Sequence, residues 1–313
     1  MKLTTEVNVE KTAKKLSHKD RILLVGSCFS QNIGERLAVG GFQTLINPFG
    51  TIYNPFSIAQ TLDYIGNNKF FNEEDALQNG DLWKLFTCHG EIFGFSKDEV
   101  LHLAQQKQQE ANAFLVNDPV ILITLGTAWL YSHVESGKVM ANCHKVDAKL
   151  LSRRMMSCEE VVKELCSAIE RLNAFCKCRI IFTISPVRHW KEGFRDNLLS
   201  KSVLHIAVSE ICNEIGAEYF PAYEVVFDQL RDYRFYSDDL LHPNSQAIEI
   251  IWEKFSDAYF DQTTKALYQK CKRLHSMQNH RPLYPQSAQY KQHLQQTQEL
   301  NEEIKSELNK LRQ

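Results

Sequence analysis

The sequence predicts an α/β fold in which a mostly parallel sheet is sandwiched between helices. Three short aliphatic runs indicate strands: "RILLV" at 21–25, "PVILITL" at 119–125 and "RIIFTI" at 179–184. Continuous apolar runs of this length are typical of strands that are covered on both faces. Helical patterns separate the runs, and such alternation favours a parallel sheet with helices on each side.

The helices are indicated by apolar residues at helical spacing. The segments 159–175 and 197–215 each carry one apolar face, formed by Val162, Leu165, Ile169 and Leu172 in the first and by Leu204, Val208, Ile211 and Ile215 in the second. A third apolar stripe runs from Ile248 to Tyr259 and follows "HPNSQ". Asn244 or Ser245 in that motif can cap the helix.

Two regions break the alternation of strands and helices. Residues 47–118 include a predicted helix around 56–66 and a Gln-rich helix near 98–115, so they are expected to form an insertion between core strands. Beyond Phe260, "HRPLYPQS" at 280–287 reads as a linker before a polar helix over 288–312. We therefore expect one domain over 1–262 and a helical extension over 263–313. Its sparse heptad spacing favours packing on the domain or weak self-association into a homo-oligomer.

Composition limits the classes of partner and the location. The 313 residues carry a net charge of -2, which supplies no broad basic field for nucleic acid or an anionic membrane. Small substrates, neutral or weakly charged, fit this balance better. The first 20 residues hold no apolar signal segment and no later window is long and apolar enough to span a membrane, so we expect a cytoplasmic chain. The nine irregularly spaced cysteines favour reduced thiols.

The segment "LLVGSCFSQNIGERL" at 23–37 predicts a strand, a turn of small residues and a helix. Such a turn lets one side chain stand above the sheet edge, beside the backbone N–H groups of the helix start. That arrangement suits a nucleophile, either Ser27 or Cys28. It is equally compatible with a tight structural connection.

A base for such a nucleophile is offered by "YSDDLLHPN", in which Asp239 and His242 form an Asp-x-x-His unit. One short loop can carry both the imidazole and the carboxylate that orients it. The neighbouring Asp238 is a competing orienting carboxylate. The structural alternative is that His242 caps or packs against the following helix.

Six motifs in this order resemble the GSCFA-domain family, a branch of the SGNH (GDSL-like) hydrolases, over about residues 5–260: "GSCF", "NPFGTIYNP", "TLGTAW", "ANCHK", "SPVRH" and the late "DLLHPN". The resemblance implies a three-layer α/β/α sandwich, with Ser27 as nucleophile, Asp239 as acid and His242 as base. It further implies an esterase for short acyl groups, such as acetyl, on a carbohydrate or similar polar molecule, without a cofactor.

The resemblance also implies an oxyanion hole made from the Ser27 N–H, the Gly50 N–H and an asparagine side chain. The sequence departs from this pattern, because Thr127 stands where the wider superfamily has asparagine. The Thr127 hydroxyl can donate a hydrogen bond itself, or Asn47, Asn54 or Asn142 can fold in from another loop. Asn47 and Asn54 each precede proline, which equally indicates turns.

Further residues are expected to line the substrate site. "ANCHK" supplies Asn142 and His144, and "SPVRH" supplies Arg188 and His189 after a predicted strand, where parallel sheets bind ligands. Arg188 can clamp a carboxylate or phosphate of the substrate, or pair with a structural acid. The spacings of cysteine and histidine do not match a zinc site, so no metal is expected.

These observations together predict a serine esterase that acts through an acyl-enzyme intermediate. An acyltransferase with the same serine differs only in the molecule that accepts the acyl group. A non-catalytic scaffold on the same fold is a third reading. Cys28 is expected to turn into the interface between helix and sheet as a small buried side chain.

Overall fold

A parallel sheet of five strands forms the centre of the molecule, whose computed structural model describes residues 4–116, 118–188 and 193–312. The strands are Arg21–Gly26 (β1), Gln43–Ile46 (β2), Val120–Leu125 (β6), Arg179–Ile184 (β10) and Glu218–Phe220 (β11). Their order in the sheet is β11-β10-β6-β1-β2, and each neighbouring pair is parallel. The three predicted strands are therefore confirmed.

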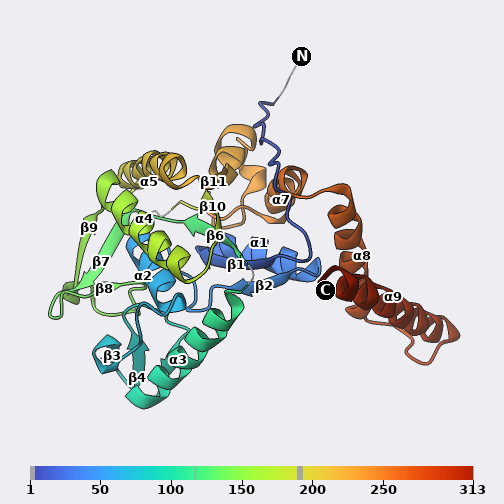
Figure 1. The fold of residues 1–313 in the computed structure, drawn as a ribbon, viewed down its shortest axis with the longest axis horizontal. Coiled ribbons are helices and arrows are strands. Elements are labelled where there is room, and N and C mark those ends of the chain that lie inside the picture. The colour runs from blue at the N-terminus through green and yellow to red at the C-terminus, as the bar shows by residue number, and fades with distance from the viewer. Residues whose placement is uncertain (1–3, 117, 189–192, 313) are drawn as a thin grey trace.

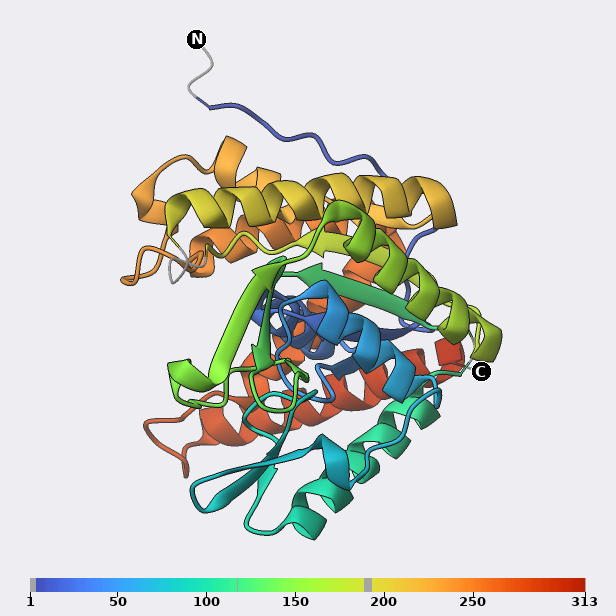
Figure 2. The same ribbon diagram turned by 90° about the vertical axis from the view of Figure 1, so that its left-hand side faces the viewer.

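Helices cover both faces of this sheet (Figure 2). Alternate residues of β1 point to opposite faces, as in any strand. Leu23 and Val25 pack beneath one group of helices, whereas Ile22 and Leu24 pack beneath the other. The first group is Pro55–Ile65 (α2), Cys158–Phe175 (α4) and Phe194–Ile215 (α5), and the second is Cys28–Val39 (α1) and Ser245–Tyr259 (α7). Gln262–Gln278 (α8) packs on the second group through Tyr268. The predicted α/β/α sandwich is confirmed.

The helix bounds follow the predicted stripes and caps. The segment 159–175 matches α4, whose capping box at Ser157 fixes its start. The segment 197–215 lies within α5, which ends at Gly216 in the left-handed conformation. Of the two residues proposed to cap α7, Asn244 does so, because its Oδ1 accepts from the Ala247 N–H at 3.0 Å.

Residues 47–118 hold the two predicted helices, α2 and Lys97–Phe114 (α3). The sequence did not predict the two small antiparallel sheets of the molecule. One is formed by Ala76–Asn79 (β3), Leu82–Leu85 (β4) and Phe93–Gly94 (β5), and the other by Trp129–His133 (β7), Val139–Met140 (β8) and Leu151–Met155 (β9). Because α2 contributes Ile58 and Leu62 to the main core, the segment is integral to the sandwich.

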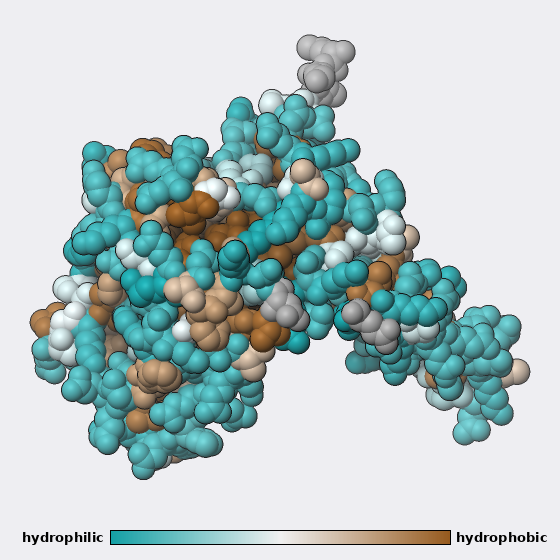
Figure 3. All heavy atoms as spheres, viewed as in Figure 1, coloured by the Kyte–Doolittle hydropathy of each residue, from teal (hydrophilic) through white to brown (hydrophobic). Residues whose placement is uncertain are grey.

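The C-terminal helices form a hairpin that extends from the sandwich (Figure 1). Its first helix, α8, places Tyr268 in the main core, and its second, Ala288–Arg312 (α9), packs on α8 through Ile304. The outer surface of the hairpin is largely hydrophilic (Figure 3). Its last turn returns to the sandwich, where Arg312 donates to the Gly41 carbonyl at 2.7 Å. Within the described residues, no helix is long and apolar enough to cross a membrane.

None of the nine cysteines, all of which lie in the described part of the chain, forms a disulfide. Cys176 caps the end of α4, and Cys178 precedes the first residue of β10. Their Sγ atoms lie 3.2 Å apart, because the connection turns between them.

Candidate active site

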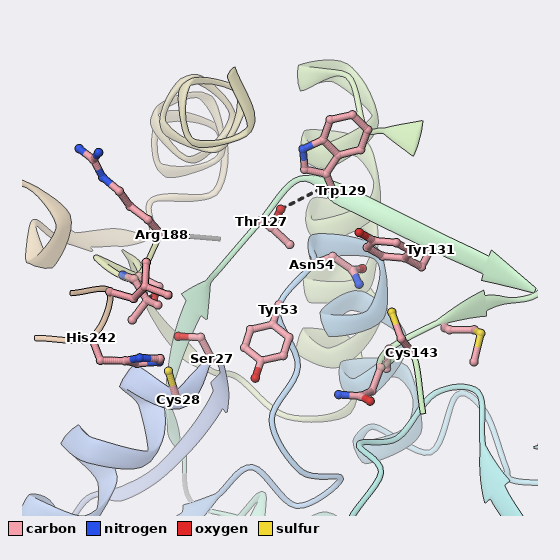
Figure 4. A pocket seen from close by; sticks show the side chains of 16 residues that line it. Ser27, Cys28, Tyr53, Asn54, Thr127, Trp129, Tyr131, Cys143, Arg188 and His242 are labelled. Atoms are coloured by element: carbon pink, nitrogen blue, oxygen red, sulfur yellow. Dashed lines mark hydrogen bonds between the residues drawn. The ribbon is translucent and has the colours of Figure 1, made fainter. Parts of the chain in front are cut away.

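The carboxyl ends of β1, β6 and β10 border a cavity of about 440 Å³ (Figure 4). Ser27 follows β1, Thr127 follows β6, and Ser185 and Arg188 follow β10, while His242 enters from the loop before α7. Parallel strands present their carboxyl ends at one sheet edge, which is where α/β proteins bind ligands. The topology therefore gathers into one cavity several residues that are far apart in the sequence.

Ser27 occupies the turn between β1 and α1. Its N–H donates to the Thr124 carbonyl at 3.2 Å, and its Oγ accepts from the Phe29 N–H at 3.3 Å as the N-cap of α1. The preceding Gly26 has φ +142°, and a Cβ there would lie 2.2 Å from the Thr124 oxygen. Only glycine lets β1 approach β6 this closely, so Gly26 determines where Ser27 leaves the sheet.

Asp239 and His242 form a bonded pair within one tight loop. The Nδ1 of His242 lies 2.6 Å from Oδ2 of Asp239, while Oδ1 accepts from the N–H groups of Leu241 and His242. Those backbone donors, with the His242 ring, lower the pKa of Asp239 to about 2. An ionised carboxylate accepts the Nδ1 proton, which leaves Nε2 with its lone pair as the basic nitrogen. Of the two neighbouring aspartates, Asp239 is the one bonded to the imidazole.

The His242 ring lies beside the Ser27 hydroxyl and the Cys28 thiol (Figure 4). Ser27 is 1% exposed, whereas the side chain of His242 is 48% exposed, so the imidazole stands between the cavity and solvent. No hydrogen bond joins Ser27 to His242 in the described structure. Catalytic hydrogen bonds are often long in a ligand-free enzyme and tighten when substrate binds.

Cys28 does not enter the helix–sheet interface, so that expectation is wrong. It is the first residue of α1, lines the cavity next to Ser27 and is half-buried. Burial raises the pKa of the Cys28 thiol, although the N–H groups at the helix start and the nearby Lys201 oppose this shift. A raised pKa disfavours the thiolate, which is the nucleophilic form of cysteine.

The two backbone groups expected to form the oxyanion hole have other partners. The Ser27 N–H donates to Thr124, and the Gly50 N–H donates to the Asn47 carbonyl at 2.8 Å. Gly50 is also absent from the lining of the cavity. Its φ of +79° and close packing on His89 give it a structural role in the turn. We therefore correct the assignment of both N–H groups.

Among the asparagines considered as substitutes, Asn47 is not in the cavity lining, and its Oδ1 accepts from the Gly26 N–H at 2.9 Å. Asn54 does line the cavity. Its Oδ1 caps α2 by accepting from the Ser57 N–H at 2.8 Å, which fixes the orientation of the amide. The Nδ2 end is then left as a donor group between Tyr53 and Tyr131 (Figure 4).

Thr127 also lines the cavity, but its hydroxyl belongs to a local network. Oγ1 accepts from the Trp129 N–H at 3.2 Å and lies 3.1 Å from the Ser200 hydroxyl, which accepts from the Ala128 N–H at 2.8 Å. The Thr127 proton is available to a substrate only when the Ser200 hydroxyl is the donor between the two. Asn54 has no such competition for its Nδ2 hydrogens.

Lys201 is a buried residue of the site that sequence reasoning missed. It is 1% exposed, and its Nζ donates at 2.7 Å to the carbonyls of both Gly126 and Ser185. These carbonyls follow β6 and β10, so Lys201 ties together two loops that form the cavity. Burial lowers the pKa of Lys201 to about 7. A lysine in an amphipathic helix is normally exposed to solvent. The buried role of Lys201 could have been inferred only from its position in the fold, opposite the ends of β6 and β10.

The remaining predicted residues divide between the cavity and its surroundings. Asn142 lines the cavity, and its Oδ1 accepts from the His144 N–H at 3.0 Å. His144 is not in the lining; its Nε2 bonds to the Leu85 carbonyl at 2.9 Å, and burial lowers its pKa to about 4. The expected substrate contact of His144 is thus replaced by a structural one. Arg188 lines the cavity, and His189 lies outside the described residues.

No group of three or more histidine, cysteine, aspartate or glutamate residues could hold a metal ion in the described ranges. Lys201 donates to two backbone carbonyls, the Asn54 Oδ1 accepts from the Ser57 N–H, and Asp239 is bonded to His242. What the arrangement offers chemically is a hydroxyl at a helix start, an oriented imidazole and an amide donor around one cavity. These are the groups that acyl transfer through a covalent intermediate requires.

Two known structures resemble this chain remotely. A “putative acylhydrolase” from Bacteroides fragilis NCTC 9343 is 7% identical, with coverage of 82% of this chain and 91% of its own and a TM-score of 0.40. FabMG, an enoyl-acyl carrier protein reductase, is 8% identical, with coverage of 86% and 80% and a TM-score of 0.29. Neither likeness is close enough to bear on the chemistry. No curated protein matches the sequence.

The sequence itself gives a clearer assignment. The model of the GSCFA family matches residues 21–255, which span the chain from the first strand of the sheet into α7. The match includes the "GSCF" turn, the loops of the cavity and the Asp239–His242 loop. The chain therefore belongs to the GSCFA family.

Proposed function

We propose that the protein is a serine esterase of the SGNH type that hydrolyses short acyl esters. The observation that carries this proposal is that Ser27 and His242 line one cavity, with Asp239 bonded to the Nδ1 of that histidine at 2.6 Å. A nucleophile, a base and the group that orients the base are together the signature of covalent acyl transfer.

The reaction follows from these positions. His242 Nε2 takes the Ser27 proton as Oγ attacks the ester carbonyl, and a bond forms between Oγ and the acyl carbon. The bond to the alcohol then breaks, and His242 returns the proton to the leaving oxygen. Water next attacks the acyl-enzyme with His242 again as base, which releases the acid and restores Ser27. Water can reach this step because the imidazole is half exposed.

The negative charge that develops on the carbonyl oxygen needs donors other than those expected. The Asn54 Nδ2 faces the cavity, and the Cys28 N–H, as the first N–H of α1, has no partner within the helix. We assign these two groups to the oxyanion. The start of a helix adds a favourable partial charge at this position.

The cavity suits a small acyl group, such as acetyl, on a carbohydrate or similar polar molecule. Its volume of about 440 Å³ lies at the lower end of the range for small-molecule sites. The rings of Tyr53, Trp129 and Tyr131 supply apolar faces on which an acyl chain or a sugar can pack. We infer hydrolysis in preference to transfer, because half-exposed His242 gives water access to the acyl-enzyme.

A short-chain p-nitrophenyl ester assay tests this proposal directly. The wild-type protein should release nitrophenol with saturation kinetics, and Ser27→Ala should lower kcat by several orders of magnitude. Acyl transfer would appear as faster nitrophenol release, without more free acid, when an alcohol acceptor is added. A folded wild-type protein that turns over no ester of the series would support the scaffold reading and contradict the esterase.

A further inference from the structure

Arg188 is a charged residue of the cavity for which the hydrolytic mechanism has no use. It follows β10 and lines the same cavity as Ser27 and His242. The sequence left two roles open, a clamp for a substrate anion or a partner for a structural acid. Among the described residues no ion pair joins Arg188 to a carboxylate, so the structural-acid role has no support.

The guanidinium of Arg188 is instead held by an aromatic ring. Its central carbon lies 4.4 Å from the centroid of Phe227, a half-buried residue of the π-helical turn Val225–Gln229. Phe227 in turn packs on Tyr223, with ring centroids 4.3 Å apart. Stacking of this kind fixes the plane of a guanidinium and leaves its N–H edges available for a ligand.

One of those N–H groups lacks a partner even though it is shielded from solvent. The Nε of Arg188 is buried and has no hydrogen bond. A buried donor without an acceptor costs free energy, more so when the group is charged. The unpaired Nε shows that no carboxylate of the described residues engages this edge of the guanidinium, so its charge remains available to a ligand that binds at the outer N–H groups.

The surroundings of Arg188 are electropositive. None of the residues that line the cavity is an aspartate or glutamate. Fully buried Lys201 lies close enough for Arg188 to contribute to the lowering of its pKa. The carboxylates nearby are engaged elsewhere: Asp239 bonds to His242 and two backbone N–H groups, Glu224 accepts from the Tyr219 hydroxyl, and Asp228 pairs with Arg231. An anionic ligand group in the cavity would therefore meet Arg188 with no carboxylate in the lining to compete for it.

We propose that the substrate of this esterase carries an oxyanion, a carboxylate or a phosphate, and that Arg188 binds it. The guanidinium extends away from Ser27 (Figure 4), so the anion belongs to a part of the substrate remote from the ester carbonyl. A planar guanidinium can bind either oxyanion with two parallel hydrogen bonds. This inference rests on the proposed esterase function and narrows its substrates to anionic esters.

Three esters with the same acyl group test the inference: one of a neutral alcohol, one of a carboxylate-bearing alcohol and one of a phosphate-bearing alcohol. For the wild-type protein, kcat/KM should be at least about tenfold higher for one of the anionic esters than for the neutral one, and the ratio should fall as salt is added. Arg188→Gln should bring this ratio close to one, mainly through KM. Arg188→Lys should retain part of it, because the charge remains but the planar fork is lost.

Arg234→Gln is the matched control, because Arg234 also stacks on a phenylalanine, at 5.1 Å from the Phe235 centroid, but lies outside the cavity. It should leave the ratio unchanged. The same esters bound to Ser27→Ala, measured by calorimetry, give a readout that does not need turnover. Hydrolysis without an anionic preference, or a preference that survives in Arg188→Gln, overturns the inference alone. Absence of turnover overturns the esterase, and the calorimetry then still decides whether Arg188 binds the anion.

Discussion

At the scale of single residues, Asn54 combines two roles that can be separated by one substitution. Its Oδ1 caps α2, and its Nδ2 faces the cavity as the proposed oxyanion donor. Asn54→Asp keeps an oxygen for the cap but loses the donor. We expect kcat to fall about 100- to 1000-fold while the free energy of unfolding changes little.

Esterase kinetics together with urea unfolding check this prediction. Asn54→Ala is the companion variant, because it loses both roles and should also destabilise the protein by about 1 kcal/mol. If Asn54→Asp keeps the wild-type kcat, the oxyanion donor is another group, and the hydroxyl of Thr127 becomes the leading candidate.

Lys201 predicts a particular dependence of stability on pH. Burial lowers its pKa to about 7 in the folded protein, whereas an unfolded lysine has a pKa of about 10.4. Between these two pKa values the unfolded chain holds one proton more than the folded chain. The free energy of unfolding therefore increases as pH rises from 7 towards 10. Lys201→Met should lose that gain.

Urea unfolding at pH 7 and pH 9.5 gives the free energy of unfolding of the wild-type protein and of Lys201→Met. The difference between these two free energies should be larger at pH 9.5 than at pH 7. Lys163→Met, which replaces an exposed lysine of α4, is the control. Its free energy of unfolding should differ from that of the wild-type protein by the same amount at both pH values. If the free energies of unfolding of the wild-type protein and Lys201→Met differ equally at pH 7 and pH 9.5, Lys201 keeps its proton in the folded protein over this range.

At the scale of elements, the junction of β1 and α1 depends on Gly26. Its φ of +142° is rare for other residues, and a Cβ there would collide with the Thr124 carbonyl. Gly26→Ala should therefore lower the free energy of unfolding by about 2 kcal/mol or more and reduce activity, because it displaces Ser27. Chemical unfolding and ester turnover measure the two effects.

Gly137→Ala provides the control for Gly26→Ala. Gly137 also has a positive φ, of +67°, but an added Cβ there would meet nothing within 4 Å. Its substitution should cost only the backbone strain, about 1 kcal/mol, and leave turnover intact. Equal effects of the two substitutions would remove the argument that close contact between β1 and β6 positions Ser27.

The sequence predicted the elements of the sandwich well, because long apolar runs and stripes at helical spacing depend on local burial. It missed the two small antiparallel sheets, since strands such as β8, with two residues, carry no periodic signal. It also misjudged Cys28 and the N–H groups of Ser27 and Gly50. Their directions depend on the dihedral angles of tight turns and on partners that only the folded chain supplies.

The same distinction applies to the site. The Asp239–His242 pair could be predicted because both residues lie in one short loop, and their bond needs no distant element. Lys201 and the stacking of Arg188 on Phe227 could not, because each joins segments that are brought together only by the sheet. His144 was expected in the site, but a buried hydrogen bond to Leu85 holds it in the surrounding structure.

At the scale of the whole molecule, the C-terminal hairpin is predicted to be separable from catalysis. A chain that ends at His280 keeps α8, whose Tyr268 belongs to the main core, and loses α9. The loss exposes Leu267, Cys271 and Leu274, which α9 covers through Ile304. We expect the free energy of unfolding to fall by about 3 kcal/mol, while ester turnover per folded molecule is retained.

Size-exclusion chromatography and unfolding curves of the truncated and full chains check this prediction, and they also show whether α9 mediates self-association. A shift to a smaller assembly would assign the hairpin to oligomer formation. Insoluble or unfolded truncated protein would instead mean that α9 completes the fold.

The central claim is that Ser27, and not its neighbour Cys28 in the same cavity, is the nucleophile. Mass spectrometry after incubation with a fluorophosphonate measures this most directly. The wild-type protein and Cys28→Ala should each carry one covalent adduct on the peptide that contains Ser27, and Ser27→Ala should carry none. Cys28→Ala should keep kcat within about tenfold of the wild-type value. An unlabelled Ser27, with turnover abolished by Cys28→Ala in a folded protein and retained by Ser27→Ala, would contradict the account and identify a thiol enzyme.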